Sequence, residues 1–182
     1  MEIVIYYNSK TGFTKKYAGW IAEELKCNAF SYKEFTKNIP CENSVVIFGS
    51  RIHAGRIEGL NKVKARFSDK RNLIVFATGA TPASEAAVIE KMWEANFSSE
   101  EINVVPHFYM QSGLNYEKMG FVDRNIMKIV AKLVSGKKNL NETEKGFEQA
   151  IKESHDISSK DCITPLLEFV RNKYVDNGAA TA

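Results

Sequence analysis

The sequence predicts an α/β protein built on a doubly wound parallel sheet. Short apolar runs rich in β-branched residues alternate with helical patterns along the chain. The first apolar run leads within a few residues into a glycine-containing turn and then a helix. Because parallel strands are joined by right-handed crossovers, this alternation places helices on both faces of one sheet. A chain of 182 residues has the length of a single domain.

The first expected strand, Val4–Tyr7, ends at a turn rich in hydroxyl side chains, and helical apolar spacing follows over Lys15–Leu25. The N–H groups of a first helical turn lack intrahelical partners and lie at the positive end of the helix dipole, so they can hold a phosphate dianion. The hydroxyl groups add donors, and the glycine lets the backbone approach a ligand closely. The residues expected to bind phosphate are Ser9, Lys10, Thr11, Gly12, Phe13 and Thr14.

This loop carries neither of the two commonest nucleotide-binding signatures. It lacks the Gly-Lys-Ser/Thr ending of a P-loop, and it lacks the three spaced glycines of a dinucleotide fingerprint. An ordinary helix start capped by a hydroxyl is the alternative interpretation.

The later elements follow from the same two periodicities. Strands are expected at Ala29–Tyr32, Ser44–Phe48, Asn72–Ala77 and Asn103–Met110. Helices are expected at Ile57–Phe67, Ser84–Asn96, Asp123–Leu133 and Leu166–Tyr174, with a short one around Thr143–Glu153. We expect Ser84 to cap one helix, and Thr164 to cap the last helix with Pro165 at its first position. Residues 1–175 are thus expected to form one domain, followed by a flexible tail over 176–182.

Composition excludes several classes of function. The net charge of +3 is mild, and the lysines are scattered, which argues against nucleic-acid binding. Cys27, Cys41 and Cys162 have no C-x-x-C spacing, which argues against a disulfide framework or a zinc site, and we expect no metal. No apolar run reaches membrane-span length, and acidic Glu2 precedes an immediate strand, so a cytoplasmic location is expected.

The pattern from Ile5 through Ile21 carries a family resemblance. It reads apolar-apolar-aromatic-x-Ser-x-x-Gly-x-Thr-x-x-x-Ala-x-x-Ile and resembles the FMN-phosphate loop of the flavodoxin family. The resemblance implies FMN as the cofactor and a flavodoxin-like five-stranded sheet in the order 2-1-3-4-5. In that topology the ligand crevice is built from the loops after the first, third and fourth strands.

The other two loops of that crevice contain residues suited to a flavin ring. The ring needs polar backbone contacts along one edge, a flat wall, and a flexible glycine near its redox-active N5. The first loop offers Gly55 as the glycine and Ile52 or His53 as the wall. The ring-binding residues expected from both loops are Ser50, Arg51, Ile52, His53, Ala54, Gly55, Thr78, Gly79, Ala80, Thr81 and Pro82.

A second resemblance extends to about Ser135. The run Asp123-Arg124-x-x-x-Lys128-x-x-x-Lys132-x-x-Ser135-Gly136 follows a loop with glycine and tyrosine. It resembles the corresponding region of the oxygen-independent, menaquinone-linked protoporphyrinogen dehydrogenases, which are FMN proteins of flavodoxin fold with an extended helical C-terminal region. The resemblance implies a porphyrinogen substrate and a quinone acceptor. Ala54 departs from that family, which tends to carry an aromatic there, and Gln111–Gly120 has one lysine where the family has many arginines and aromatics.

The helix expected over Asp123–Leu133 has one apolar stripe and one basic flank. Two interpretations stay open: the stripe packs on the sheet with its lysines in water, or the basic flank contacts the inner face of an anionic membrane. The basic residues concerned are Arg124, Lys128, Lys132, Lys137 and Lys138.

Three classes of function follow. The first is an FMN-dependent oxidoreductase, a dehydrogenase that passes electrons to a quinone or a redox partner protein. The second is a flavodoxin-type electron carrier, which the basic balance disfavours because such carriers are typically acidic. The third is a flavin-binding module without turnover. His53 is the candidate catalytic residue, as a proton or hydrogen-bond donor near the ring; a side chain without a catalytic role is the alternative.

Overall fold

The structure is a computed structural model, and it describes residues 2–37, 44–67, 70–121, 124–125 and 153–175. One mixed sheet forms its centre. Five strands are parallel: β1 (Ile3–Asn8), β2 (Asn28–Ser31), β3 (Val45–His53), β5 (Leu73–Gly79) and β6 (His107–Gln111). Their order is β2-β1-β3-β5-β6, which confirms the predicted doubly wound order. A sixth strand, β4 (Arg56–Ile57), pairs antiparallel with β3.

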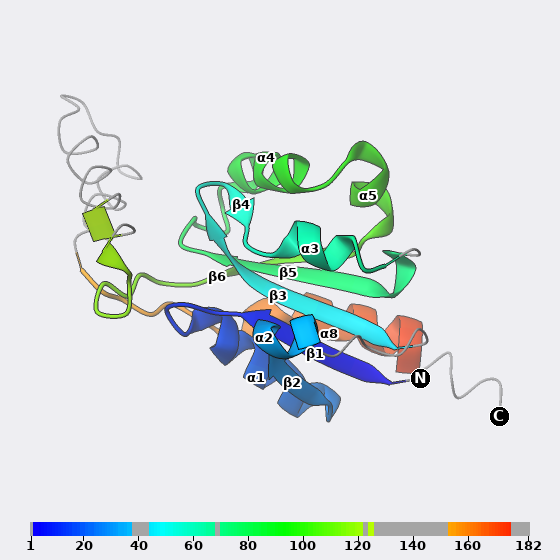
Figure 1. The fold of residues 1–182 in the computed structure, drawn as a ribbon. Helices are drawn as coiled ribbons and strands as arrows, with labels where there is room; N and C mark the ends of the chain where they lie inside the picture. The colour runs from blue at the N-terminus through cyan, green and yellow to red at the C-terminus, as the bar shows by residue number, and fades with distance from the viewer. Residues whose placement is uncertain (1, 38–43, 68–69, 122–123, 126–152, 176–182) are drawn as a thin grey trace.

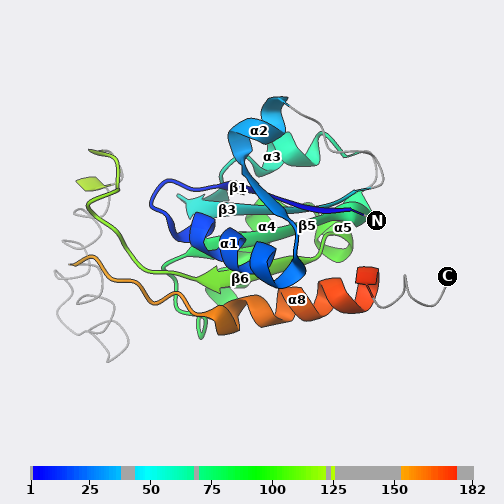
Figure 2. The ribbon, with the colours of Figure 1, turned by 90° about the horizontal axis from the view of Figure 1, so that it is seen from below.

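Helices cover both faces of the sheet (Figures 1 and 2). The first face carries α1 (Phe13–Leu25) and α8 (Thr164–Val170), which pack on β-strand residues such as Ile47 and Phe76. The other face carries α2 (Tyr32–Lys37), α3 (Leu60–Lys64), α4 (Ala86–Asn96) and α5 (Ser99–Val104). Because both faces are covered, the central strand β3 is buried over its first six residues, as a parallel strand requires.

Three predicted boundaries were wrong. The N-cap of α4 is Glu85 rather than Ser84, and the N-cap of α8 is Ile163, with Thr164 already helical. The strand predicted from Asn103 begins at His107, because Ser98 and Glu101 form a reciprocal capping box that starts α5. The apolar pattern therefore predicted the last strand, but it did not predict that the helix α5 precedes it.

The segment predicted as a helix from Ile57 opens with the hairpin strand β4 instead, and α3 begins at Leu60. The two turn residues of this hairpin, Ala54 and Gly55, both have positive φ, 48° and 75°. Positive φ at both central positions is typical of the two-residue turns that match the twist of a β-hairpin. The helices expected at Asp123–Leu133 and Thr143–Glu153, and the tail at 176–182, lie outside the described residues, apart from Arg124, Asn125 and Glu153.

The chain leaves the sheet after β6 and returns before α8. An isolated antiparallel bridge joins Leu114 to His155, and the His155 N–H donates to the Leu114 carbonyl at 2.8 Å. A methyl group on Gly113 would lie 1.7 Å from the His155 carbonyl oxygen, so only glycine permits this approach. From there, η2 (Lys160–Ile163), α8 and the π-helical turn η3 (Arg171–Val175) run along the sheet beside α1 (Figure 2).

Candidate functional site

The carboxyl ends of β1, β3 and β5 meet at one edge of the sheet. Asn8 is in register with Ser50, and Arg51 is in register with Thr78. The three loops predicted to hold a flavin therefore start side by side. In a doubly wound sheet this edge, at the point where the strand order reverses, is where ligands bind.

The loop after β1 leads directly into the N-terminus of α1. Gly12 is the N-cap residue, with φ 103°, and no side chain caps the helix. The first turn of α1 contains no acidic residue. The Ser9 hydroxyl accepts a hydrogen bond from the Gly12 N–H at 3.2 Å and so shapes the turn ahead of the helix. This donor set fits a phosphate dianion, and the uncapped end differs from the hydroxyl-capped helix start considered as the alternative.

Thr14 connects this loop to the loop after β5. Its Oγ1 lies 2.8 Å from Thr78 Oγ1, and the two hydroxyls share a hydrogen bond. Both residues are buried, with exposed fractions of 2% and 3%. Phe13 is also buried, whereas Lys10 is exposed and Thr11 is partly so. The structure thus brings together the predicted residues of two loops, with Thr14 as a link between them.

Side chains at the end of β3 are bound to Glu58. Arg51 donates from Nε and from a terminal nitrogen to the two Glu58 carboxylate oxygens, at 2.8 and 2.7 Å. The Ser50 hydroxyl donates to the Glu58 carbonyl at 2.7 Å. The hydrogen bonds from Arg51 lower the pKa of Glu58 below its usual value, despite the opposing effect of burial. These hydrogen bonds hold the hairpin to the end of β3.

Asn96 of α4 anchors the hairpin turn from outside the predicted loops. Its Nδ2 donates to the carbonyls of Gly55 at 2.8 Å and Met92 at 2.7 Å, and its Oδ1 accepts from the Ile57 N–H at 2.9 Å. Asn96 is 8% exposed. Asn96 was not among the predicted site residues, because nothing local to a helix end signals a partner some 40 residues earlier.

The candidate catalytic residue His53 lies just before the turn. Its side chain is 38% exposed, and Nδ1 lies 3.9 Å from a Glu58 carboxylate oxygen. That oxygen also accepts a hydrogen bond from Arg51, so His53 belongs to the same polar group at the base of the hairpin. A proton-transfer role for His53 stays a prediction.

The loop after β5 is held by β6 and the segment that follows it. Tyr109 donates its hydroxyl hydrogen to the Thr81 carbonyl at 2.7 Å, and the Ser112 N–H donates to the Gly79 carbonyl at 2.8 Å. A methyl group on Gly79 would lie 3.1 Å from Tyr109 Oη and 3.2 Å from Ile52 Cδ1, so these three residues are close neighbours. Burial raises the pKa of Tyr109 to about 12 and keeps it a hydrogen-bond donor at neutral pH. Tyr109 was not among the predicted site residues.

The segment after β6 also reaches the phosphate loop. A methyl group on Gly12 would lie 3.9 Å from Lys118 Nζ, and one on Gly120 would lie 3.0 Å from Lys10 Nζ. On the return path, Lys16 of α1 pairs with Asp156 at 2.7 Å. Burial alone would raise the pKa of Asp156, but hydrogen bonds from Lys16 and Ser158 lower it to about 2.

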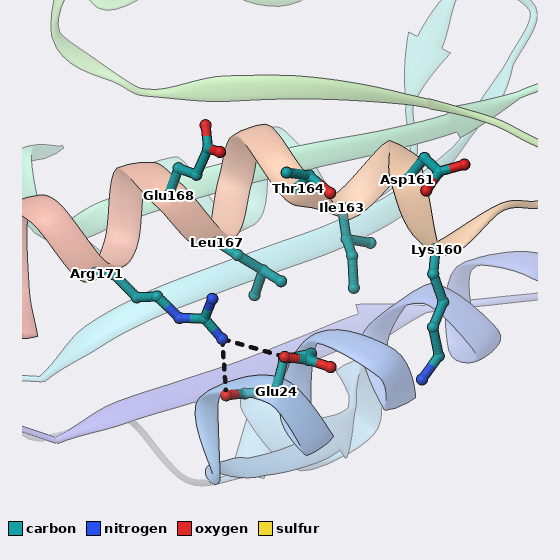
Figure 3. A pocket seen from close by; sticks show the side chains of 8 residues that line it. All are labelled: Glu24, Lys160, Asp161, Ile163, Thr164, Leu167, Glu168 and Arg171. Atoms are coloured by element: carbon teal, nitrogen blue, oxygen red, sulfur yellow. Dashed lines mark hydrogen bonds and ion pairs between the residues drawn. The ribbon is translucent and has the colours of Figure 1, made fainter.

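A separate cleft of about 280 Å³ lies between the C-terminal end of α1 and α8 (Figure 3). Arg171 crosses it and donates to the carbonyl and the carboxylate of Glu24, at 3.4 and 3.1 Å. Glu24 lies at the end of α1 opposite to the phosphate loop. The cleft is therefore distinct from the predicted flavin site.

The described part of the chain contains no cluster of three or more histidine, cysteine or acidic residues suited to a metal ion. Within the same residues, none of the helices combines the length and the apolar character that a membrane crossing requires. Cys27 and Cys162 are free thiols, while Cys41 lies outside the described ranges.

Comparison with known proteins agrees with this geometry. A search of curated protein sequences finds no match. Among solved structures, a flavodoxin from the domain Archaea aligns with 14% sequence identity and a TM-score of 0.32, over 84% of this chain and 100% of that chain. The family model described as "Flavodoxin domain" matches residues 4–141, which include all three loops. This chain therefore belongs to the flavodoxin domain family, whose members typically bind FMN and transfer electrons to redox partner proteins.

Proposed function

We propose that this chain binds FMN at the edge formed by the loops after β1, β3 and β5 and uses it in an oxidoreductase reaction. The observation that carries the proposal is the uncapped N-terminus of α1, which Thr14 links to the loop bearing Thr78. The N–H groups of the first turn and the hydroxyls of Ser9 and Thr11 would hold the phosphate. FMN, when bound, supplies reversible transfer of two electrons, singly or as hydride.

The backbones of the other two loops would hold the ring. Arg51 and Ser50 fix the hairpin through Glu58, and Tyr109 fixes the later loop through Thr81, so both backbones are preorganised. Ile52 lies beside Gly79 between these loops and offers an apolar surface there. A preorganised backbone lowers the cost of binding because less conformational freedom is lost.

A test of FMN binding compares FMN with riboflavin, which lacks the phosphate. We expect about one FMN per chain and a clear preference over riboflavin. Replacing both Thr11 and Thr14 by Ala should weaken FMN binding by roughly 2–4 kcal/mol. Loss of the Thr11 hydrogen bond to a charged group costs about 1.5–3 kcal/mol, and loss of the buried bond between Thr14 and Thr78 adds about 1 kcal/mol. Thr36→Ala serves as the control, because it removes the hydroxyl of an exposed residue of α2 that donates only to the nearby Lys33 carbonyl. Equal affinities for FMN and riboflavin would refute the assignment.

As the finer function we propose a dehydrogenase that passes electrons to a quinone, with a porphyrinogen as the electron donor. The resemblance around Asp123–Gly136, the net charge of +3 and the segment inserted between β6 and α8 support it. Contact with an anionic membrane, through the basic flank that includes Lys128 and Lys132, would bring the site to a membrane-dissolved quinone. Those two lysines lie outside the described residues.

A flavodoxin-type electron carrier is the second candidate, because the family transfers electrons to partner proteins. Two assays on the FMN-loaded chain separate the candidates. A dehydrogenase should reduce a soluble quinone analogue with porphyrinogen as donor, whereas a carrier should exchange electrons rapidly with a flavodoxin reductase and show no porphyrinogen oxidation. Binding of the chain to vesicles with anionic lipid at low salt tests the membrane contact independently.

A further inference from the structure

The turn formed by residues 115–120 lies against the phosphate loop, although about a hundred residues of sequence separate the two. Lys118 Nζ lies 3.9 Å from where a methyl group on Gly12 would be, and Gly12 is the residue that precedes α1. A methyl group on Gly120 would lie still closer to the side chain of Lys10, at 3.0 Å from its Nζ. Both views of the fold show this segment leaving β6 toward the tip of the loop after β1 (Figures 1 and 2).

The position of Lys118 is fixed by its own turn. The Asn115 side chain accepts a hydrogen bond from the Lys118 N–H at 2.9 Å, and the Asn115 carbonyl accepts one from the Met119 N–H at 3.0 Å. The Tyr116 N–H donates to the Ser154 hydroxyl at 3.0 Å, and Lys16 pairs with Asp156. The turn is thus held by Ser154, and the segment that contains Ser154 and Asp156 is held by α1.

We propose that Lys118 is a phosphate-binding residue, which places its ammonium group, together with that of Lys10, beside the terminal phosphate of FMN. This inference rests on the proposed function. Its physical basis is charge: the N-terminus of a helix offers partial positive charge, whereas an ammonium group adds a full charge and three donors. With these two lysines, the preference of this chain for FMN over riboflavin would be stronger than backbone donors alone could give.

The same arrangement assigns a role to the segment after β6. Lys118 reaches the loop only because Asn115 shapes the turn and because the bridge between Leu114 and His155 holds its base. Lys118 is therefore a specificity-determining residue that comes from the segment after β6 rather than from the three loops at the sheet edge.

The test measures dissociation constants of FMN and riboflavin for the full chain by flavin fluorescence. Lys118→Ala should weaken FMN binding about five- to tenfold, as expected for a charge-assisted contact at an exposed site, and should change riboflavin binding less than about twofold. Lys118→Arg should keep the wild-type ratio of affinities, and Lys118→Glu should weaken FMN binding about a hundredfold. The difference between wild type and Lys118→Ala should shrink from low salt to about 0.5 M NaCl, because salt screens exposed charges.

Lys91→Ala is the matched control, since Lys91 is an exposed lysine on α4. It should leave both constants unchanged. If Lys118→Ala lowers the affinities for FMN and riboflavin equally, or lowers neither, Lys118 does not bind the phosphate. A wild-type preference for FMN over riboflavin would still support the proposed function in that case. If the wild type binds riboflavin as well as FMN, both proposals fail together.

Discussion

Replacing Asn96 by Ala should test whether one helix side chain holds the hairpin of the proposed flavin site. Asn96 makes three hydrogen bonds, to the Gly55 carbonyl, the Met92 carbonyl and the Ile57 N–H. The Met92 carbonyl belongs to α4 itself, and Gly55 is exposed, so water can replace the side chain at that carbonyl. Ile57 is 4% exposed, and its N–H would lose its partner in a place that water does not readily reach.

The loss in stability follows from these differences. A buried donor left without a partner costs about 1–3 kcal/mol, and the loss of a well-packed polar side chain adds to it. We expect Asn96→Ala to lower the free energy of unfolding by about 2–4 kcal/mol. For a urea dependence of about 2 kcal/mol per molar, the midpoint of unfolding should fall by about 1–2 M.

The assay is urea unfolding followed by circular dichroism. Asn103→Ala is the matched control, because the exposed Asn103 on α5 makes one local bond to the Ser99 carbonyl. The control should cost less than about 0.5 kcal/mol. If the midpoints of Asn96→Ala and Asn103→Ala coincide, Asn96 does not anchor the hairpin as described.

Two further predictions concern glycine and acid stability. Gly49→Ala would place a methyl group 1.9 Å from the ring of fully buried Phe76 and should destabilise the fold by more than about 3 kcal/mol. In Gly19→Ala on α1 the new methyl group meets no atom within 4 Å, and the variant should be more stable by up to about 1 kcal/mol. Thermal unfolding measures both changes. The pKa of Asp156 is lowered from 3.8 to about 2 in the fold, so its pairing with Lys16 stabilises the protein above about pH 4 and loses that effect as the pH falls toward 2. Asp156→Asn should therefore lower stability at pH 7 by at most about 0.5 kcal/mol, because the pair is partly exposed, and should match the wild type near pH 2; an equal difference at both pH values would contradict the pairing.

The strands and the turn into α1 were predictable because they depend on patterns within short segments, whereas the order of the strands followed from the family resemblance. Continuous apolar runs mark strands buried on both faces, and the glycine after the first strand marks the turn into α1. The family resemblance of the phosphate loop agrees with the family match over residues 4–141. These features were recognisable because each one is encoded by neighbouring residues.

Other features depend on partners distant in sequence and were not predictable in this way. Ala54 takes a positive φ that favours glycine or asparagine, so the two-residue turn carried no strong local signal. The turn was therefore predicted as part of a loop, and Ile57 of β4 as the first residue of a helix. Tyr109 and Asn96 meet their loops only in the folded chain. The sequence pattern identified Ser50 and Arg51 as candidate ring contacts, whereas the structure shows that their side chains bind Glu58.

The close approach of Gly113 to His155 has a consequence for how this protein can change. The chain departs from the flavodoxin core and rejoins it at nearly the same point, because the bridge between Leu114 and His155 holds the two ends of the intervening segment together. Since closing a longer connection costs only slightly more entropy than closing a shorter one, insertions that follow the turn of residues 115–120 should leave the sheet edge almost unaffected. Gly113 and His155 thus mark a natural junction at which a new acceptor-recognition module can be joined to an unchanged flavin core.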